Sequence, residues 1–321
     1  MNNLQTYSNN KFQADVPKKA DSTIFSSTCR ASVFGAFLLL GTASALAAPV
    51  VVQNVGGDLS SVTLNGTATL NPIGNANNEY NNMGWSNVDG YLYAVDVNGT
   101  GYTGGNDGIV RIDPTTGLAT NLGSPSGLPG GAGSRFDAGD VYRNTMWITF
   151  GDQNAGTGTA YKNILYTLDL SAVTGGGNDI SGTSVSTMGI TGADAWVNDW
   201  AYNPLDGLLY GGNQLNGTLA TLDPLTGLRS TFTVDGLLSS GAFGAAWYDP
   251  TVGDVFLYQN SGTVFQIDPE TKSLIASWDA GGASRNDGAY IGTVVPVPAA
   301  VWLFGSGLLG MVGIARRRKT S

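Results

Sequence analysis

The chain has 321 residues, of which 47 are glycine, one is cysteine and none is histidine, and its formal net charge is −9. The lack of histidine excludes imidazole as a general base or metal ligand, and the single Cys29 excludes disulfides within the chain and thiolate metal clusters. The acidic balance excludes nucleic acid as a favourable partner. The apolar fraction of 42% is sufficient for a hydrophobic core.

Residues 1–48 have the organisation of an N-terminal extension that ends in a secretory signal peptide. A short apolar stretch over residues 31–48 follows Arg30 and ends in small side chains. Ala45 and Ala47 form an A-x-A cleavage site at its end. We therefore expect export of the chain and removal of this segment.

Residues 49–294 contain a repeated unit. An Asp-Pro turn between apolar runs recurs at residues 111–118, 221–228 and 266–273. Proline presets the backbone of a turn, and the glycine that follows in the first two copies accepts a left-handed conformation. An Asp-Gly turn precedes two of these copies, at residues 89–90 and 206–207, and is a strong signal for a β-hairpin. Each unit is therefore predicted to contain four strands.

Four-stranded units that repeat about every 45–60 residues predict an all-β fold. The predicted fold is a β-propeller of about five blades, with six or seven as alternatives. The third residue of each predicted first strand is Gly or Ala, as expected where innermost strands crowd the axis. The last unit ends near Val294, too early for a complete blade. Residues 50–70 could supply its missing outer strands and so close the ring. The repeats resemble those of bacterial propeller-type proteins of the NHL and kelch kind. The predicted first strands begin at Asn82, Asp137, Asp199, Gly244 and Asp287.

This alignment places Asp137, Asp199 and Asp287 near one mouth of the central channel, with Asn82 at the same position in a fourth blade. Converging oxygen ligands suit a hard cation, so calcium is the one cofactor that the sequence suggests. The same side chains could instead bind the hydroxyl groups of a glycan. In a third interpretation each aspartate only caps its own loop. Aromatic residues near these positions are Trp85, Trp200 and Tyr290.

Catalysis would have to depend on carboxylates, as it does in glycoside hydrolysis. The pairs Asp137/Asp140 and Asp194/Asp199 are candidates, but they match no glycosidase motif. We therefore expect a non-catalytic protein. The alternative is a carboxylate-dependent extracellular polysaccharide hydrolase or lyase on a propeller scaffold.

Residues 295–321 have the organisation of a membrane-spanning tail. A Val-Pro-Val-Pro sequence precedes an uncharged stretch over residues 299–315, which would be about 25 Å long as a helix. This length is just sufficient for a thin bilayer, with the basic residues that follow on the cytoplasmic side.

The combination of Pro296, Val297 and Pro298 with the Gly-Ser-Gly of the apolar stretch and with Arg316, Arg317 and Arg318 resembles the PEP-CTERM sorting signal. Val297 stands where the Pro-Glu-Pro motif of that family has glutamate, as in the related V-P-x-P-A variant. The resemblance implies an exosortase-type membrane protease as a partner and only transient membrane anchoring. It also implies secretion across the inner membrane of a Gram-negative bacterium to the cell surface or extracellular matrix. We therefore expect a biofilm or envelope protein that binds exopolysaccharide or a surface protein.

Overall fold

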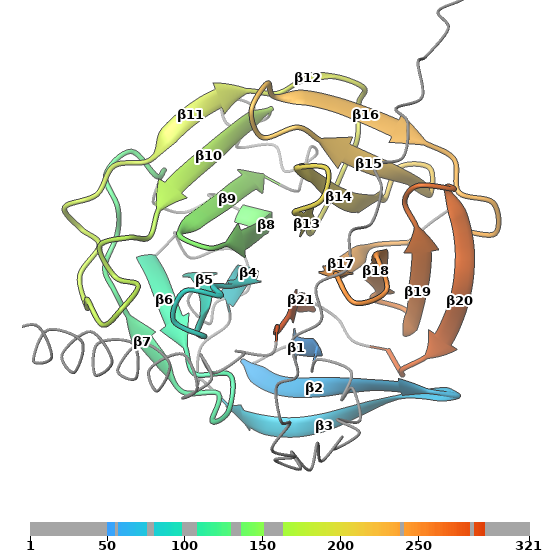
Figure 1. Ribbon diagram of the computed structural model, residues 1–321, viewed down its shortest axis with the longest axis horizontal. Coiled ribbons are helices and arrows are strands. Elements are labelled where there is room, and N and C mark those ends of the chain that lie inside the picture. The colour runs from blue at the N-terminus through green and yellow to red at the C-terminus, as the bar shows by residue number, and fades with distance from the viewer. Residues whose placement is uncertain are drawn as a thin grey trace, which may run out of the picture. The chain divides into compact units, whose positions relative to one another are not determined.

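A computed structural model of the chain describes residues 50–54, 57–75, 80–97, 108–129, 136–150, 163–237, 241–282 and 286–292. The chain divides into two units, Met1–Ser44 and Ala45–Ser321, and the first lies outside the described residues. The described part of the second unit is all-β and forms five sheets arranged as the blades of a propeller (Figure 1). The predicted fold class is thus confirmed, with five blades.

Four blades each consist of four strands that follow one another in the chain, and the first of the four is innermost. Blade 3 has one additional short strand at its outer edge. Blade 1 comprises β4 (Tyr80–Trp85), β5 (Leu92–Asp96), β6 (Gly108–Ile112) and β7 (Ala119–Asn121). Blade 2 comprises β8 (Phe136–Tyr142), β9 (Thr145–Phe150), β10 (Ile164–Asp169) and β11 (Ser186–Gly189). Blade 3 comprises β13 (Ala201–Asn203), β14 (Leu208–Asn213), β15 (Thr218–Leu222) and β16 (Leu228–Phe232), with the short β12 (Thr191–Gly192) parallel to β16. Blade 4 comprises β17 (Phe243–Asp249), β18 (Asp254–Gln259), β19 (Thr263–Asp268) and β20 (Ser273–Asp279).

Blade 5 joins the two ends of the domain. Its inner strand β21 (Asp287–Tyr290) pairs with β1 (Val50–Asn54), which continues into β2 (Asp58–Asn65) and β3 (Thr67–Asn75). The β1/β21 pair is antiparallel, with Val50 opposite Tyr290. This pairing confirms that the start of the domain completes the last blade and so closes the ring.

The Asp-Pro turns share one conformation. The first aspartate of each turn accepts a hydrogen bond from the amide two residues later, at 2.8 Å in all three copies, as expected for Asx turns. Gly117 and Gly227 adopt φ values of 74° and 72° at the end of the turn. Lys272 occupies the same place in the third copy with a φ of 58°, so this turn keeps its shape without glycine.

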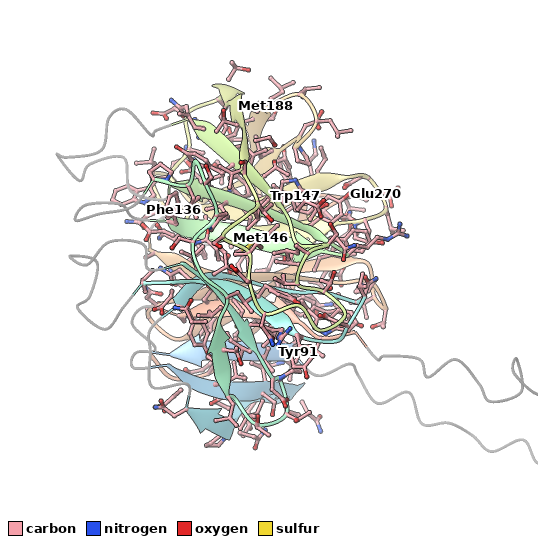
Figure 2. The ribbon with its side chains drawn as sticks, turned by 90° about the vertical axis from the view of Figure 1, so that its left-hand side faces the viewer. Tyr91, Phe136, Met146, Trp147, Met188 and Glu270 are labelled. Atoms are coloured by element: carbon pink, nitrogen blue, oxygen red, sulfur yellow. The ribbon has the colours of Figure 1, made fainter. Side chains whose placement is uncertain are left out.

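The hydrophobic core lies between successive blades. Alternate side chains of a strand face opposite sides of its sheet, so each blade contributes to two clusters. On β9, Met146 packs in the cluster shared with blade 1, whereas Trp147 packs in the cluster shared with blade 3 (Figure 2). Because each sheet needs both neighbours for burial, the blades stabilise one another around the ring.

The inner strands approach one another closely around the axis. A Cβ atom added to Gly84 would lie 2.0 Å from the backbone nitrogen of Val141 in blade 2, and one added to Gly139 would lie 2.9 Å from the Cβ atom of Asn82 in blade 1. The expectation that the inner strands are too crowded at this position for a larger side chain is thus confirmed at Gly84 and Gly139.

The Gly84→Ala variant should lower the free energy of unfolding by about 1–3 kcal/mol, because the added methyl group meets backbone that belongs to the next blade. Gly182→Ala is the matched control, since a Cβ atom there meets nothing within 4 Å. Urea denaturation of both variants measures the difference. Equal stability of the two variants would contradict the close approach at the axis.

The two predicted targeting segments, residues 1–48 and 295–321, lie outside the described residues. These segments include the cleavage site at Ala45 and Ala47, the Pro296–Pro298 motif and the arginines from Arg316 to Arg318. In the part of the chain that the structure describes, no helix is long and apolar enough to cross a membrane.

Candidate functional site

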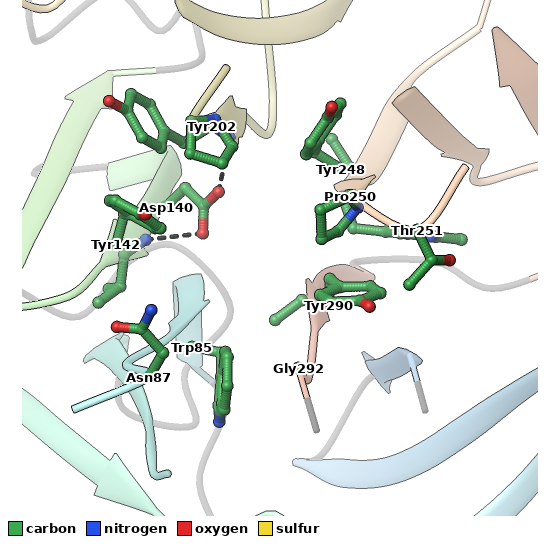
Figure 3. A pocket seen from close by; sticks show the side chains of 15 residues that line it. Trp85, Asn87, Asp140, Tyr142, Tyr202, Tyr248, Pro250, Thr251, Tyr290 and Gly292 are labelled. Atoms are coloured by element: carbon green, nitrogen blue, oxygen red, sulfur yellow. Dashed lines mark hydrogen bonds between the residues drawn. The ribbon is translucent and has the colours of Figure 1, made fainter. Parts of the chain in front are cut away.

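A pocket of about 410 Å³ opens at one end of the propeller axis, and every blade contributes to its wall (Figure 3). The pocket is rich in aromatic side chains and has few polar ones. Its aromatic residues are Trp85, Tyr142, Tyr202, Trp247, Tyr248 and Tyr290. Its polar side chains include Asn87, Asp140 and Thr251.

The position of these residues follows from the geometry of the inner strands. The residue directly after the small Gly or Ala at the axis lines the pocket in every blade. This residue is aromatic in four blades and aspartate in blade 2, because the five positions are Trp85, Asp140, Tyr202, Trp247 and Tyr290. Side chains two residues apart on a strand share a face, so Asn87, Tyr142 and Pro204 line the same pocket.

Neighbouring blades hold the aromatic rings in place. Tyr202 packs between Tyr142 and Trp147, with ring centroids at 5.1 and 4.4 Å. Trp247 is 1% exposed and stacks on Phe256 at 5.3 Å. Trp247 therefore supports the wall from behind. The preorganised aromatic surface that faces a ligand comes from the half-buried Trp85, Tyr142, Tyr202 and Tyr290.

Asp140 connects blade 2 to blade 3 beside the pocket. Its Oδ1 accepts a hydrogen bond from the backbone of Val141, and its Oδ2 accepts one from the backbone of Tyr202, both at 2.6 Å (Figure 3). Burial raises the pKa of the Asp140 carboxyl to about 7, and these two hydrogen bonds lower it by less. Near neutral pH this group therefore exists in both protonation states.

Asp199 makes the same connection between blades 3 and 4. Its oxygens accept hydrogen bonds from the backbone nitrogens of Trp200 at 2.8 Å and Ala246 at 2.6 Å. Asp287 connects blade 5 to blade 1, because its oxygens accept hydrogen bonds from Gly288 at 2.7 Å and Met83 at 2.9 Å. Each carboxyl thus joins its own inner strand to the inner strand of the next blade.

The carboxyls of Asp199 and Asp287 lie near each other at the axis, and each residue is 1% exposed. Burial is the main cause that raises the pKa of both groups, and the nearby Asp140 carboxylate raises both further. Two neighbouring buried carboxyls cannot both be ionised at low cost, so the pair retains a proton at neutral pH. We call Asp140, Asp199 and Asp287 the axial carboxyls.

The predicted site residues are only partly brought together. Asp199 and Asp287 meet as expected, but the third carboxyl near them is Asp140 rather than Asp137. The pairing register of β8 with β9 shifts between Phe136 and Ala138, so Asp137 lies in a β-bulge. Similar shifts occur at Asn82 in blade 1 and Gly244 in blade 4.

The other predicted residues have structural partners. Asn82, with a φ of 61°, donates a hydrogen bond from Nδ2 to the Phe136 carbonyl at 2.6 Å. Trp200 is 2% exposed, and its indole nitrogen donates a hydrogen bond to Thr149 in the core. Within the described ranges, no group of three or more Asp, Glu, His or Cys side chains is arranged to hold a metal ion. The calcium prediction therefore gains no support from the part of the chain that is described.

The fold and the pocket together define the class: a five-bladed β-propeller with an aromatic pocket at one end of its axis. The chain belongs to the DUF6923 family, described as a repeat of unknown function, whose family model matches residues 51–293. No curated protein matches the sequence.

Among the solved structures that match the chain are two with TM-scores below 0.5. A chain in the crystal structure of a nidogen/laminin complex is 13% identical with a TM-score of 0.42, and the match covers 75% of this chain and 97% of that one. The computationally designed Ika8 protein is 14% identical with a TM-score of 0.36, and the match covers 73% of this chain and 62% of that one. Similarity at this level identifies no ligand.

Proposed function

We propose that this protein is a non-catalytic binding protein of the cell surface or extracellular matrix, and that its axial pocket binds sugar residues of an exopolysaccharide. The observation that carries the proposal is the ring of aromatic side chains that all five blades contribute to one pocket. The flat faces of such rings bind the apolar C–H faces of sugars, while nearby carboxyl, amide and hydroxyl groups bind sugar hydroxyls. The volume lies within the roughly 300–1,000 Å³ that is typical of small-molecule pockets.

The Trp85→Ala variant should bind polysaccharide roughly tenfold more weakly, because it removes one aromatic wall of the pocket. Trp196→Ala is the matched control, since Trp196 is half-buried and does not line the pocket. Affinity electrophoresis against the exopolysaccharide of the producing bacterium compares the two variants, with melting temperatures recorded for each. An equal loss of binding in both variants would locate the binding site elsewhere.

The proposal includes export by the predicted signal peptide and processing of the PEP-CTERM-like tail by an exosortase-type protease. It rests on the sequence of residues 1–48 and 295–321. Mass spectrometry of the protein released from cells should find no peptides from residues 299–321. Replacing Arg316, Arg317 and Arg318 by alanine should prevent this processing, and recovery of the intact tail from the released wild-type protein would reject the sorting role.

One observation favours a second candidate, a carboxylate-dependent polysaccharide hydrolase or lyase. Asp140 lines the pocket, and a carboxyl with a pKa of about 7 can act as a general acid near neutral pH. A reducing-sugar release assay on the protein distinguishes the two functions. Binding without turnover supports the non-catalytic function, whereas turnover that is lost in Asp140→Asn supports the hydrolase.

A further inference from the structure

A second cavity, of about 430 Å³, lies between blades 3 and 4 and is strongly acidic. Neither lysine nor arginine is among its lining residues. We call this cavity the blade 3/4 cleft. Its carboxylates come from Asp206 of blade 3 and from Asp254, Asp268 and Glu270 of blade 4.

The hydroxyl group of Tyr248 is an unpartnered polar group that faces this cleft. Tyr248 is 4% exposed, and its hydroxyl oxygen is buried with no hydrogen-bond partner. Tyr248 lines the cleft together with Asp206 and Asp254. Burial raises the pKa of Tyr248, and the carboxylates of Asp206 and Asp254 raise it further. Figure 3 shows the hydroxyl directed away from the axial pocket, so the blade 3/4 cleft is where a ligand could satisfy it.

The interface between blades 1 and 2 shows which chemical group fits the equivalent position in the blade 3/4 cleft. The Tyr93 hydroxyl donates a hydrogen bond to Asp89 at 2.7 Å, as the Tyr210 hydroxyl does to Asp206 at 2.6 Å. On the next strand, Arg111 lies opposite Tyr93. Thr221 has the equivalent position opposite Tyr210. Blade 3 therefore has the same acid and tyrosine as blade 1 but lacks the arginine.

The guanidinium of Arg111 fills the space between blades 1 and 2. Its Nη1 donates hydrogen bonds to the carbonyls of Val173 at 3.3 Å and Gly177 at 2.9 Å, and its Nη2 donates one to Asn178 Oδ1 at 2.8 Å. These acceptors lie in the connection between β10 and β11 of blade 2. The equivalent connection of blade 4, between β19 and β20, carries Glu270 and lies on the same side of the ring as Tyr91, on which Arg111 stacks (Figure 2).

We propose that the blade 3/4 cleft binds the guanidinium group of an arginine side chain on a partner protein, in the position that Arg111 occupies between blades 1 and 2. Four carboxylates without a cation supply the charge complementarity. A planar guanidinium can donate to carboxylates in pairs and to the Tyr248 hydroxyl as well, which a compact ammonium group does less well. Of the described residues, Tyr248 is the one that lines both this cleft and the axial pocket, and its hydroxyl is directed away from the pocket, so a partner protein and a polysaccharide could bind at once.

The test uses the peptide acetyl-Gly-Arg-Gly-amide and its citrulline counterpart, which has the same shape but no charge. Nuclear magnetic resonance titration of the protein should show shifts centred on residues 206–210 and 268–270, with affinity for the arginine peptide at least tenfold higher than for the citrulline peptide. Equal affinity for both peptides, or shifts spread over the whole acidic surface, would overturn the proposal.

Two variants make the test specific to the cleft. The double variant Asp206→Asn, Glu270→Gln should bind the arginine peptide at least tenfold more weakly. The control Asp58→Asn, Asp169→Asn removes the same charge from exposed positions on blades 5 and 2 and should leave binding unchanged. Thr221→Arg should fill the cleft from within, abolish binding and leave polysaccharide binding unaffected. Retention of peptide binding by Thr221→Arg in a folded protein would contradict the equivalence with Arg111.

Discussion

The midpoint of thermal unfolding should fall as the pH rises from about 5 to about 8, because the axial carboxyls hold protons in the folded protein that the unfolded chain has already lost. An aspartate in an unfolded chain loses its proton near pH 4, whereas burial keeps the pKa of Asp140 at about 7 and raises the pKa values of Asp199 and Asp287. The stabilisation is therefore complete below the unfolded pKa and is lost as the pH rises through the folded pKa values. Each extra proton changes the free energy of unfolding by about 1.4 kcal/mol per pH unit within this window.

The Asp199→Asn variant separates this effect from the general repulsion of an acidic protein. Its amide has no titrating proton, so the decline of the melting temperature with pH should be shallower than in the wild type. Its Nδ2 cannot accept the hydrogen bond that one Asp199 oxygen accepts from the backbone, so the variant should also be less stable at pH 5. Asp235→Asn is the control, since it removes one negative charge from an exposed position. Calorimetry between pH 5 and 8 compares the three proteins, and parallel curves would show that the axial pair is not the source of the pH dependence.

Deletion of residues 50–75 should abolish the folded monomer. This segment supplies β1, β2 and β3, and without them the inner strand β21 loses its only partner in the described sheets. Val51, Val52 and Leu59 are fully buried, and the loss of their burial, about 1.5–3 kcal/mol each, is comparable with the whole stability of a typical domain. An exposed strand edge also promotes aggregation. Size-exclusion chromatography and circular dichroism measure the result.

A single substitution in β1 tests the closure of the ring without removing a whole segment. Val51→Asp places an unpaired charge between blades and should cost about 4 kcal/mol, whereas Val88→Asp is the control because Val88 is 52% exposed. Equal unfolding midpoints for the two variants, or a stable monomer after the deletion, would mean that the ring does not depend on the β1/β21 pair.

Local turn chemistry explains why the blades could be predicted from the sequence. Asp-Pro and Asp-Gly turns are determined by a few adjacent residues, so their spacing showed the repeat, and the requirement for small residues at the axis marked the inner strands. The long connection between β10 and β11, and the short parallel strand β12, could not be predicted in the same way. Their backbone is held by contacts with other parts of the chain, such as the bonds that Arg111 donates to residues 173–178.

The site was less predictable because it depends on register. Counting from the first residue of each inner strand identified Asp199 and Asp287, but a β-bulge at Asp137 left Asp140 as the third carboxyl. Counting one residue beyond the small Gly or Ala would have found the wall of the axial pocket from sequence alone. No local signal predicts that the Asp199 and Asp287 carboxyls lie near each other, because the two residues are 88 positions apart along the chain and only ring closure brings them together.

The β1/β21 pair also determines how the domain would respond to mechanical force. Val50 and Tyr290 are opposite each other, so the chain enters and leaves the domain at the same end of this antiparallel pair. Tension applied between these two points would load the backbone hydrogen bonds one after another, from the pair at Val50 to the pair at Gln53, rather than all together in shear. Blade 5 is therefore where a stretched protein would open first. Blades 1 to 4 would remain joined to one another by Asn82, Asp140 and Asp199 after the ring had parted.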